Sequence, residues 1–244
     1  MAKQAHDTWT VLEHDPIEEL TDNLWRVEGA LPRMALRRQM LVARTSDGRL
    51  LIHNGVALEE PLMKRIEDWG RPTWLVVPNG WHRLDAPSFK ARYPDIQVIA
   101  PRGSRGKIEQ VVPVDIDYDQ FEPVLGEDGE PELRLFHLRG LRDAEGMVEL
   151  RSRDGVTLIC NDAIFNQPHL PGVFGAIYRL LGQSGRPKVT IIARWFMMKD
   201  KRAFAEHLRE LAQIPNLARV APAHIDLITG DPAAVLAGLA DELS

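Results

Sequence analysis

Several polar segments of this sequence directly follow short apolar runs, and they contain residue types that bind metal ions or move protons. The segments are residues 54–55, 78–85, 161–163 and 222–224. Each apolar run has the length of a strand, and functional groups gather at the carboxyl ends of strands in open α/β sheets. Imidazole and carboxylate groups in such loops bind divalent metals or act as general acids and bases. The pattern therefore indicates a candidate site built from several loops.

Two stretches of the chain show hairpin signals followed by a mixture of strands and helices. In the first, expected strands cover residues 24–29, 40–43, 50–53, 74–77 and 96–100, with helical patterns at 58–69 and 87–93. In the second, expected strands cover 133–138, 147–150, 156–160 and 219–221, with helices at 171–182, 200–213 and 233–243. The turn signals at residues 45–48 and 153–155 close hairpins. We therefore expect two sheets packed face to face with helices outside, an α/β (α+β) fold.

Composition excludes several classes of protein. The chain has 244 residues, of which 44% are hydrophobic, and its net charge is −5. This mildly acidic balance argues against binding to nucleic acid or to an anionic membrane. Cys160 is the one cysteine, no apolar run approaches the ~18 residues of a membrane span, and no signal peptide is visible. We expect a polar N-terminal arm over residues 1–19, a single domain over 20–244, and a cytoplasmic location.

The order of the segments resembles the metallo-β-lactamase superfamily. Its members carry a hairpin ending in Asp-x-Gly, a Thr-His-x-His-x-Asp-His loop, a Gly-His-Thr-x-Gly segment, and strands ending in Gly-Asp and Pro-Gly-His. The corresponding segments here are residues 51–55, 76–84, 139–148, 158–163 and 220–224. The resemblance covers residues 20–230, and it implies a four-layer αββα sandwich and a hydrolase-like protein that acts on a small-molecule substrate.

The departures from the family pattern concern its metal ligands. The four ligand positions of the central loop fall on Asn79, Trp81, Arg83 and Leu84, none of which is a usual zinc ligand. By the resemblance, Asp162 and His224 stand at the positions of the bridging carboxylate and of the last histidine. With His82 they would form a site for a single zinc, iron or manganese ion. Without a metal, His82 would cap the following helix or form hydrogen bonds within its loop, and Asp162 would organise a turn and bind His224.

Three functional readings follow from this degenerate motif. In the first, the protein is a single-metal hydrolase with Asp162 and His224 at the catalytic centre and Glu145 (or Asp143) as a fourth ligand or base. Arg83, Arg142 and Asn79 would then bind substrate. In the second, the metal is lost and the fold serves as a binding or assembly module. In the third, Asp162 and His224 perform acid–base chemistry without metal.

These readings make different geometric predictions. A metal centre requires the donor atoms of its ligands to lie ~3–4 Å apart around one point. A module without metal predicts an arginine inserted between the carboxylates, with Trp81 and Leu84 closing the pocket. Arg83, Arg139 and Arg142 are the candidates for that arginine. The apolar segment 171–182 offers a possible contact for a homo-oligomer.

Overall fold

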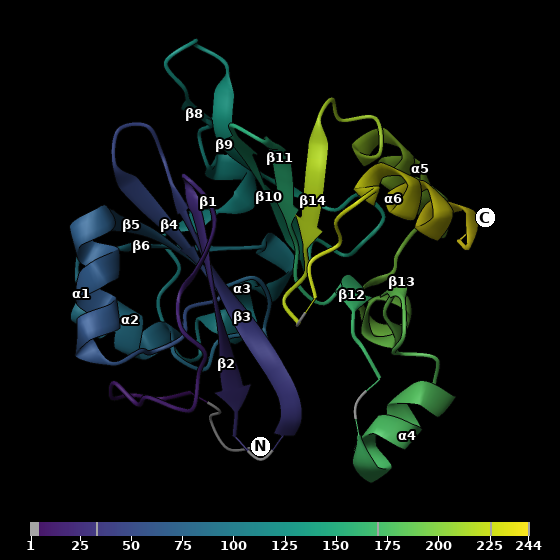
Figure 1. The fold of residues 1–244 in the computed structure, drawn as a ribbon, viewed down its shortest axis with the longest axis horizontal. Helices are drawn as coiled ribbons and strands as arrows, with labels where there is room; N and C mark the ends of the chain where they lie inside the picture. The colour runs from purple at the N-terminus through teal and green to yellow at the C-terminus, as the bar shows by residue number, and fades with distance from the viewer. Residues whose placement is uncertain (1–4, 33, 170, 225, 244) are drawn as a thin grey trace.

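The computed structural model describes residues 5–32, 34–169, 171–224 and 226–243, and its core is two β-sheets packed face to face (Figure 1). The first sheet has seven strands in the order of the sequence. Four of them form an antiparallel meander: β1 (Glu18–Thr21), β2 (Leu24–Leu31), β3 (Met34–Arg44) and β4 (Arg49–His53). Three more continue in parallel: β5 (Arg71–Val76), β6 (Gln97–Ala100) and β7 (Ile116–Asp117).

The second sheet has five strands in the order β14-β11-β10-β9-β8. These are β14 (Leu217–Ala221), β11 (Gly155–Ile159), β10 (Gly146–Ser152), β9 (Pro131–His137) and β8 (Val124–Leu125). The β10–β11 hairpin turns at Gly155, whose φ of 128° lies in a region that residues with a side chain rarely adopt. β14 pairs in parallel with β11, so the two strands end at the same edge of the sheet.

Helices cover the outer face of each sheet, which completes the four layers (Figure 1). The first sheet carries α1 (Glu60–Trp69) and α2 (Ala86–Arg92), and α3 (Arg105–Ile108) follows a 3₁₀ turn at Arg102–Ser104. The second sheet carries α5 (Lys201–Leu211) and α6 (Pro232–Asp241). Asp231 caps α6, which overlaps the helix expected at 233–243, by accepting the backbone N–H of Ala234 at 2.9 Å. The αββα prediction is therefore confirmed.

Alternation along the strands divides the apolar side chains among three cores. On β4, Leu50 and Ile52 face α1 and α2, whereas Leu51 faces the second sheet. On β11, Leu158 faces α5 and α6, whereas Ile159 joins Leu51 between the sheets. Because both faces of these strands are buried, their sequences are short continuous apolar runs, which is how they could be recognised as strands.

The N-terminal arm and an excursion after β11 complete the fold. The arm is packed on the domain, since the Trp9 indole donates to the carbonyl of Leu58 at 2.9 Å and its ring contacts Phe89. The excursion contains β12 (Ile164–Asn166), α4 (Gly172–Leu180), β13 (Pro187–Val189) and a π-helical turn (Ala193–Met197). A 3₁₀ turn at Tyr118–Gln120 precedes β8. α4 lies away from the sandwich, beyond the small β12–β13 sheet (Figure 1). None of the described helices is long and apolar enough to cross a membrane.

Candidate metal centre

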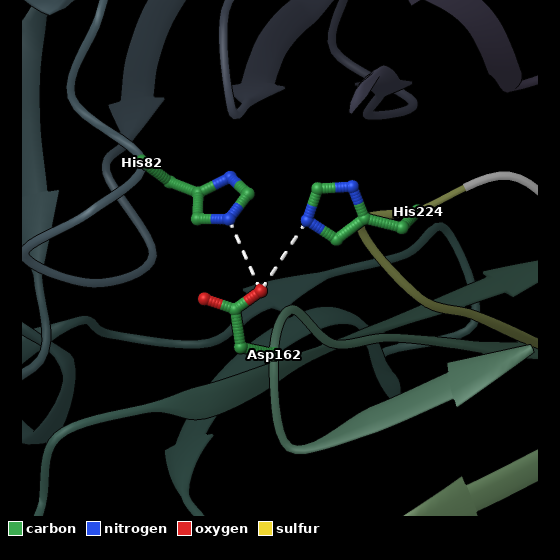
Figure 2. A group of neighbouring side chains, drawn as sticks. All are labelled: His82, Asp162 and His224. Atoms are coloured by element: carbon green, nitrogen blue, oxygen red, sulfur yellow. Dashed lines mark hydrogen bonds and ion pairs between the residues drawn. The ribbon is translucent and has the colours of Figure 1, made fainter. Parts of the chain in front are cut away.

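Three side chains from three strand ends converge at one edge of the sandwich (Figure 2). His82 lies in the loop after β5 of the first sheet, and Asp162 and His224 follow β11 and β14 of the second. Nε2 of His82 is 3.1 Å from Oδ1 of Asp162, and Nε2 of His224 is 3.4 Å from the same oxygen. One potential ligand atom from each residue lies within 4.8 Å of the others. The structure thus brings together the three residues predicted to bind metal.

The hydrogen-bond partners of the two imidazoles determine where their protons lie. Nδ1 of His224 faces the backbone carbonyl of Arg37. Nδ1 of His82 is 3.3 Å from Oδ1 of Asn54. A carbonyl oxygen only accepts, so both Nδ1 atoms carry hydrogen and donate. With hydrogen on Nδ1, each Nε2 presents a lone pair toward Asp162 when the imidazole is neutral and donates a hydrogen bond to it when the imidazole is protonated.

Asn54 is itself held in place, which makes its orienting role on His82 specific. Its Nδ2 donates to the backbone carbonyl of Gln39 at 2.8 Å, so its Oδ1 turns toward His82. Asn54 follows β4 with a φ of 56°, a left-handed conformation that asparagine tolerates better than most residues. Oxygen acceptors that orient ligating histidines in this way are common in metal sites.

Asp162 is held from behind by Glu145, which lies on the loop leading into β10. The two carboxylate oxygens of Glu145 accept the backbone N–H groups of Asn161, Asp162 and Ala163 at 3.0, 2.8 and 2.8 Å. Glu145 is fully buried, and its carboxylate binds this loop instead of joining the three converging ligands. The structure therefore places Glu145 as a support for Asp162, away from the position of a fourth ligand or base.

Asn79 connects the His82 loop to the same two carboxylates. Its Nδ2 donates to Oδ2 of Asp162 at 2.8 Å and lies 3.4 Å from Oε2 of Glu145. Its Oδ1 accepts the backbone N–H of Trp81 at 2.9 Å and that of His82 at 3.2 Å. The group between the carboxylates is thus a neutral amide. A cavity opens beside His82, Asp162 and His224. Asn79 is fully buried and does not line this cavity, so its position lends no support to the predicted contact with substrate.

The pKa values of the two buried carboxyl groups, Glu145 and Asp162, are shifted in opposite directions. Burial and then the negative charge of Asp162 raise the pKa of Glu145. Burial also opposes ionisation of Asp162, but positive charge at His82 and hydrogen bonds from His224 and His82 outweigh it and lower the pKa of Asp162. Asp162 is therefore the carboxylate that stays ionised, which is the form that binds a cation.

The arginines predicted near the site lie elsewhere. Arg83 turns toward α3, where its guanidinium donates to the carbonyl of Lys107 and to Gln110 at 3.1 Å. Arg139 pairs with Glu210 on α5, and Arg142 is exposed. None of the three lines the cavity or lies between Asp162 and Glu145. The inserted arginine expected of a metal-free module is not found among these residues, and Arg83 and Arg142 are not placed to bind substrate there.

The three converging residues open into a cavity of about 520 Å³. Trp81 and Leu84 line this cavity and leave it open, with Trp81 half exposed. The ring of Phe165 on β12 packs edge-on against His224 with a centroid separation of 4.9 Å. Sequence reasoning missed Phe165 and the orienting role of Asn54. The strand-end position of Asn54 was visible in the sequence but its contact with His82 was not, and Phe165 lies outside the expected strands.

Arg38 is a cavity residue that the sequence did not single out. It lies on β3, is nearly fully buried, and forms an ion pair with Asp85. The carboxylate of Asp85 also accepts the backbone N–H of Ala57 at 3.1 Å and contacts Nδ1 of His6 at 2.7 Å. Arg38 lies in the polar run at residues 37–39, before the strand expected at 40–43, and nothing in that run indicates that its guanidinium reaches a site.

Comparisons with known proteins identify the fold. No protein-family model matches the sequence, and no curated protein does. The structure resembles the DIM-1 metallo-β-lactamase, with a TM-score of 0.59 and 15% identity over 95% of this chain and all of that one. It also resembles a metallo-β-lactamase from Pontibacter korlensis, with a TM-score of 0.58 and 13% identity over 94% and 99% of the chains. The chain therefore has the metallo-β-lactamase fold.

A third similar structure is that of a protein in a mono-zinc form. FIM-1 from Pseudomonas aeruginosa, solved in its mono-zinc form, matches with a TM-score of 0.55 and 13% identity over 93% of this chain and 96% of that one. The fold is thus found around a single zinc ion. In the present chain, the His82, Asp162 and His224 group is the set of described residues that could hold one ion.

Proposed function

We propose that the protein is a hydrolase that uses a single divalent transition-metal ion bound by His82, Asp162 and His224. The observation that carries the proposal is the convergence of two Nε2 atoms on one oxygen of the buried Asp162 carboxylate, while the Nδ1 atom of each ring faces an oxygen acceptor. Without a positive charge between them, these electron-rich atoms would repel one another. Tetrahedral ligands ~2.0–2.2 Å from zinc lie about 3.4 Å apart, close to the 3.1 and 3.4 Å separations present here.

The donor set and its surroundings fit such an ion. Two imidazoles and one carboxylate suit zinc, iron or manganese. Such an ion supplies Lewis acidity and lowers the pKa of water at the site. The Arg37 carbonyl and Asn54 orient the imidazoles, whereas Glu145 and Asn79 orient Asp162. All three ligands line the open cavity, which gives a small molecule access to the site.

A second candidate is a binding module that has lost the metal. Asn79 favours it, because a neutral amide bridges the carboxylates at one of the family's ligand positions. In this case the imidazoles would be protonated and would form ion pairs with Asp162. The two candidates differ in whether the group retains a metal after purification.

Metal content and hydrolysis test the proposal together. We expect protein purified without chelator to contain close to one equivalent of zinc, iron or manganese, and to hydrolyse members of a panel of esters, thioesters, lactones and β-lactams. The His82→Ala/His224→Ala variant should lose both properties. A His14→Ala/His169→Ala variant is the matched control, because these histidines contact Glu59 and Ser184 outside the site. Absence of metal after reconstitution would refute the proposal in favour of the module.

A further inference from the structure

The wall of the cavity beside the candidate metal centre is built from apolar and aromatic side chains. Leu31 and Leu36 come from the β2–β3 hairpin, and Leu84 comes from the loop that carries His82. On the other side lie Phe165 of β12 and Ile192. Leu36 and Phe165 are buried, and the wall therefore offers a ligand close apolar contact.

The mouth of the same cavity is also apolar. Met34, Trp81 and Phe196 line it, and their side chains are 53%, 51% and 66% exposed. Large apolar side chains gathered around one opening are a mark of a binding site. A ligand seated in the cavity would cover part of this surface, which adds a hydrophobic contribution to its binding.

Charge in the cavity is unfavourable for an anion. Fifteen described residues line it, and Arg38 is the one among them with a permanently positive side chain. That charge is already paired with the buried carboxylate of Asp85. Asp162, in contrast, lines the cavity as a carboxylate. An anionic group away from the metal position would thus find a neutralised cation and a negative charge.

We propose that this cavity takes an uncharged ligand with a long apolar group, such as a neutral acyl amide or ester. The apolar group lies along Leu36, Phe165 and Ile192, and the polar carbonyl end faces His82, Asp162 and His224. Because this proposal assigns a substrate class, it rests on the proposed hydrolase function. The volume of about 520 Å³ falls within the range of pockets that bind small organic ligands.

Displacement of the uncharged fluorophore N-phenyl-1-naphthylamine tests the assignment without requiring turnover. The competitors are butanamide, hexanamide and octanamide, compared at pH 8 with alkanesulfonates of the same chain lengths, which are permanently anionic and poor metal ligands. We expect amide affinity to rise about fourfold for each added CH₂. Each amide should displace the probe at a concentration at least about tenfold lower than its matched sulfonate. A flat chain-length series, or sulfonates that bind as well as amides, would overturn the assignment.

Two neighbouring substitutions locate the binding. Ile192 lines the cavity, whereas the adjacent Ile191 does not, and both are half-buried. Ile192→Asn should weaken octanamide binding about tenfold, because it places an unpaired amide against the chain. Ile191→Asn should change it less than about twofold. Equal effects of the two substitutions would overturn the assignment. Metal content is recorded in the same samples, so amide binding by protein that holds no metal even after reconstitution would refute the hydrolase proposal while the ligand class stands.

Discussion

Glu145 should be among the most costly carboxylates to remove, although it lies outside the group of converging ligands. One of its oxygens accepts the N–H groups of Asn161 and Ala163, and the other accepts that of Asp162 and faces Asn79. Truncation to alanine leaves three buried N–H donors without these acceptors. Each such donor costs about 1–3 kcal/mol.

The expected loss for Glu145→Ala is about 3–5 kcal/mol of the free energy of unfolding. This value lies toward the lower end of the summed cost of three unpaired N–H donors. The reason is that removal of Glu145 also relieves its electrostatic repulsion with Asp162, which helps to raise the pKa of Glu145. Glu145→Gln keeps one carbonyl oxygen that accepts the N–H groups of Asn161 and Ala163. Its NH₂ group, however, faces the N–H of Asp162, so that two donors oppose each other. We expect it to cost about 1–3 kcal/mol.

Urea denaturation followed by circular dichroism measures these losses, with Glu149→Ala as the matched control. Glu149 lies on β10, which follows Glu145 directly, but it pairs with a partly exposed Arg134, so its removal should cost less than about 1 kcal/mol. Metal content should fall in the order wild type, Glu145→Gln, Glu145→Ala, because the loop carrying Asp162 loosens. If Glu145→Ala were as stable as Glu149→Ala, the supporting role of Glu145 would be refuted.

Three further predictions concern other parts of the structure. Asp85→Ala should cost about 3–5 kcal/mol in urea denaturation because it leaves the Arg38 guanidinium buried and unpaired; a loss below 1 kcal/mol would contradict this. Burial lowers the pKa of His207 to about 4, so the unfolded chain takes up a proton between pH 6.5 and 4 that the folded chain does not. His207 should therefore lower the free energy of unfolding by about 3 kcal/mol as the pH falls through this window, and His207→Gln should make the profile from urea titrations shallower while leaving the part due to His53, whose pKa burial lowers to about 3; an unchanged slope would contradict this. Asn54→Ala should weaken metal binding about 10–100-fold in competition titrations with a chelator, whereas a similar loss on truncating a distant asparagine would argue against orientation of His82.

The layers of the fold could be predicted because local patterns determine them. Residues 50–52 are buried on both faces of the sheet, so they appear in the sequence as a short continuous apolar run that indicates a buried strand. Asp231 is of a residue type that favours the N-cap position, and it caps α6 in the structure. These signals involve residues close in sequence, so a single sequence contains them.

The site was predictable only in part because its decisive contacts are long-range. The ligand types and strand-end positions pointed to His82, Asp162 and His224, which the structure brings together. The direction of a loop side chain is not encoded locally, so Arg83 could not be seen to turn toward α3. Likewise, the pairing of Glu145 with the backbone after β11 depends on how two segments meet.

The distribution of the three candidate ligands over both sheets has a consequence for the order of folding. His82 follows the first sheet, whereas Asp162, 80 positions later, and His224 follow the second. The site is therefore complete only after the two halves have docked, and contacts between such distant segments form late. An ion captured there would slow unfolding and leave the rate of folding almost unchanged. Such an ion would stabilise the completed sandwich and would not serve as a nucleus for its folding.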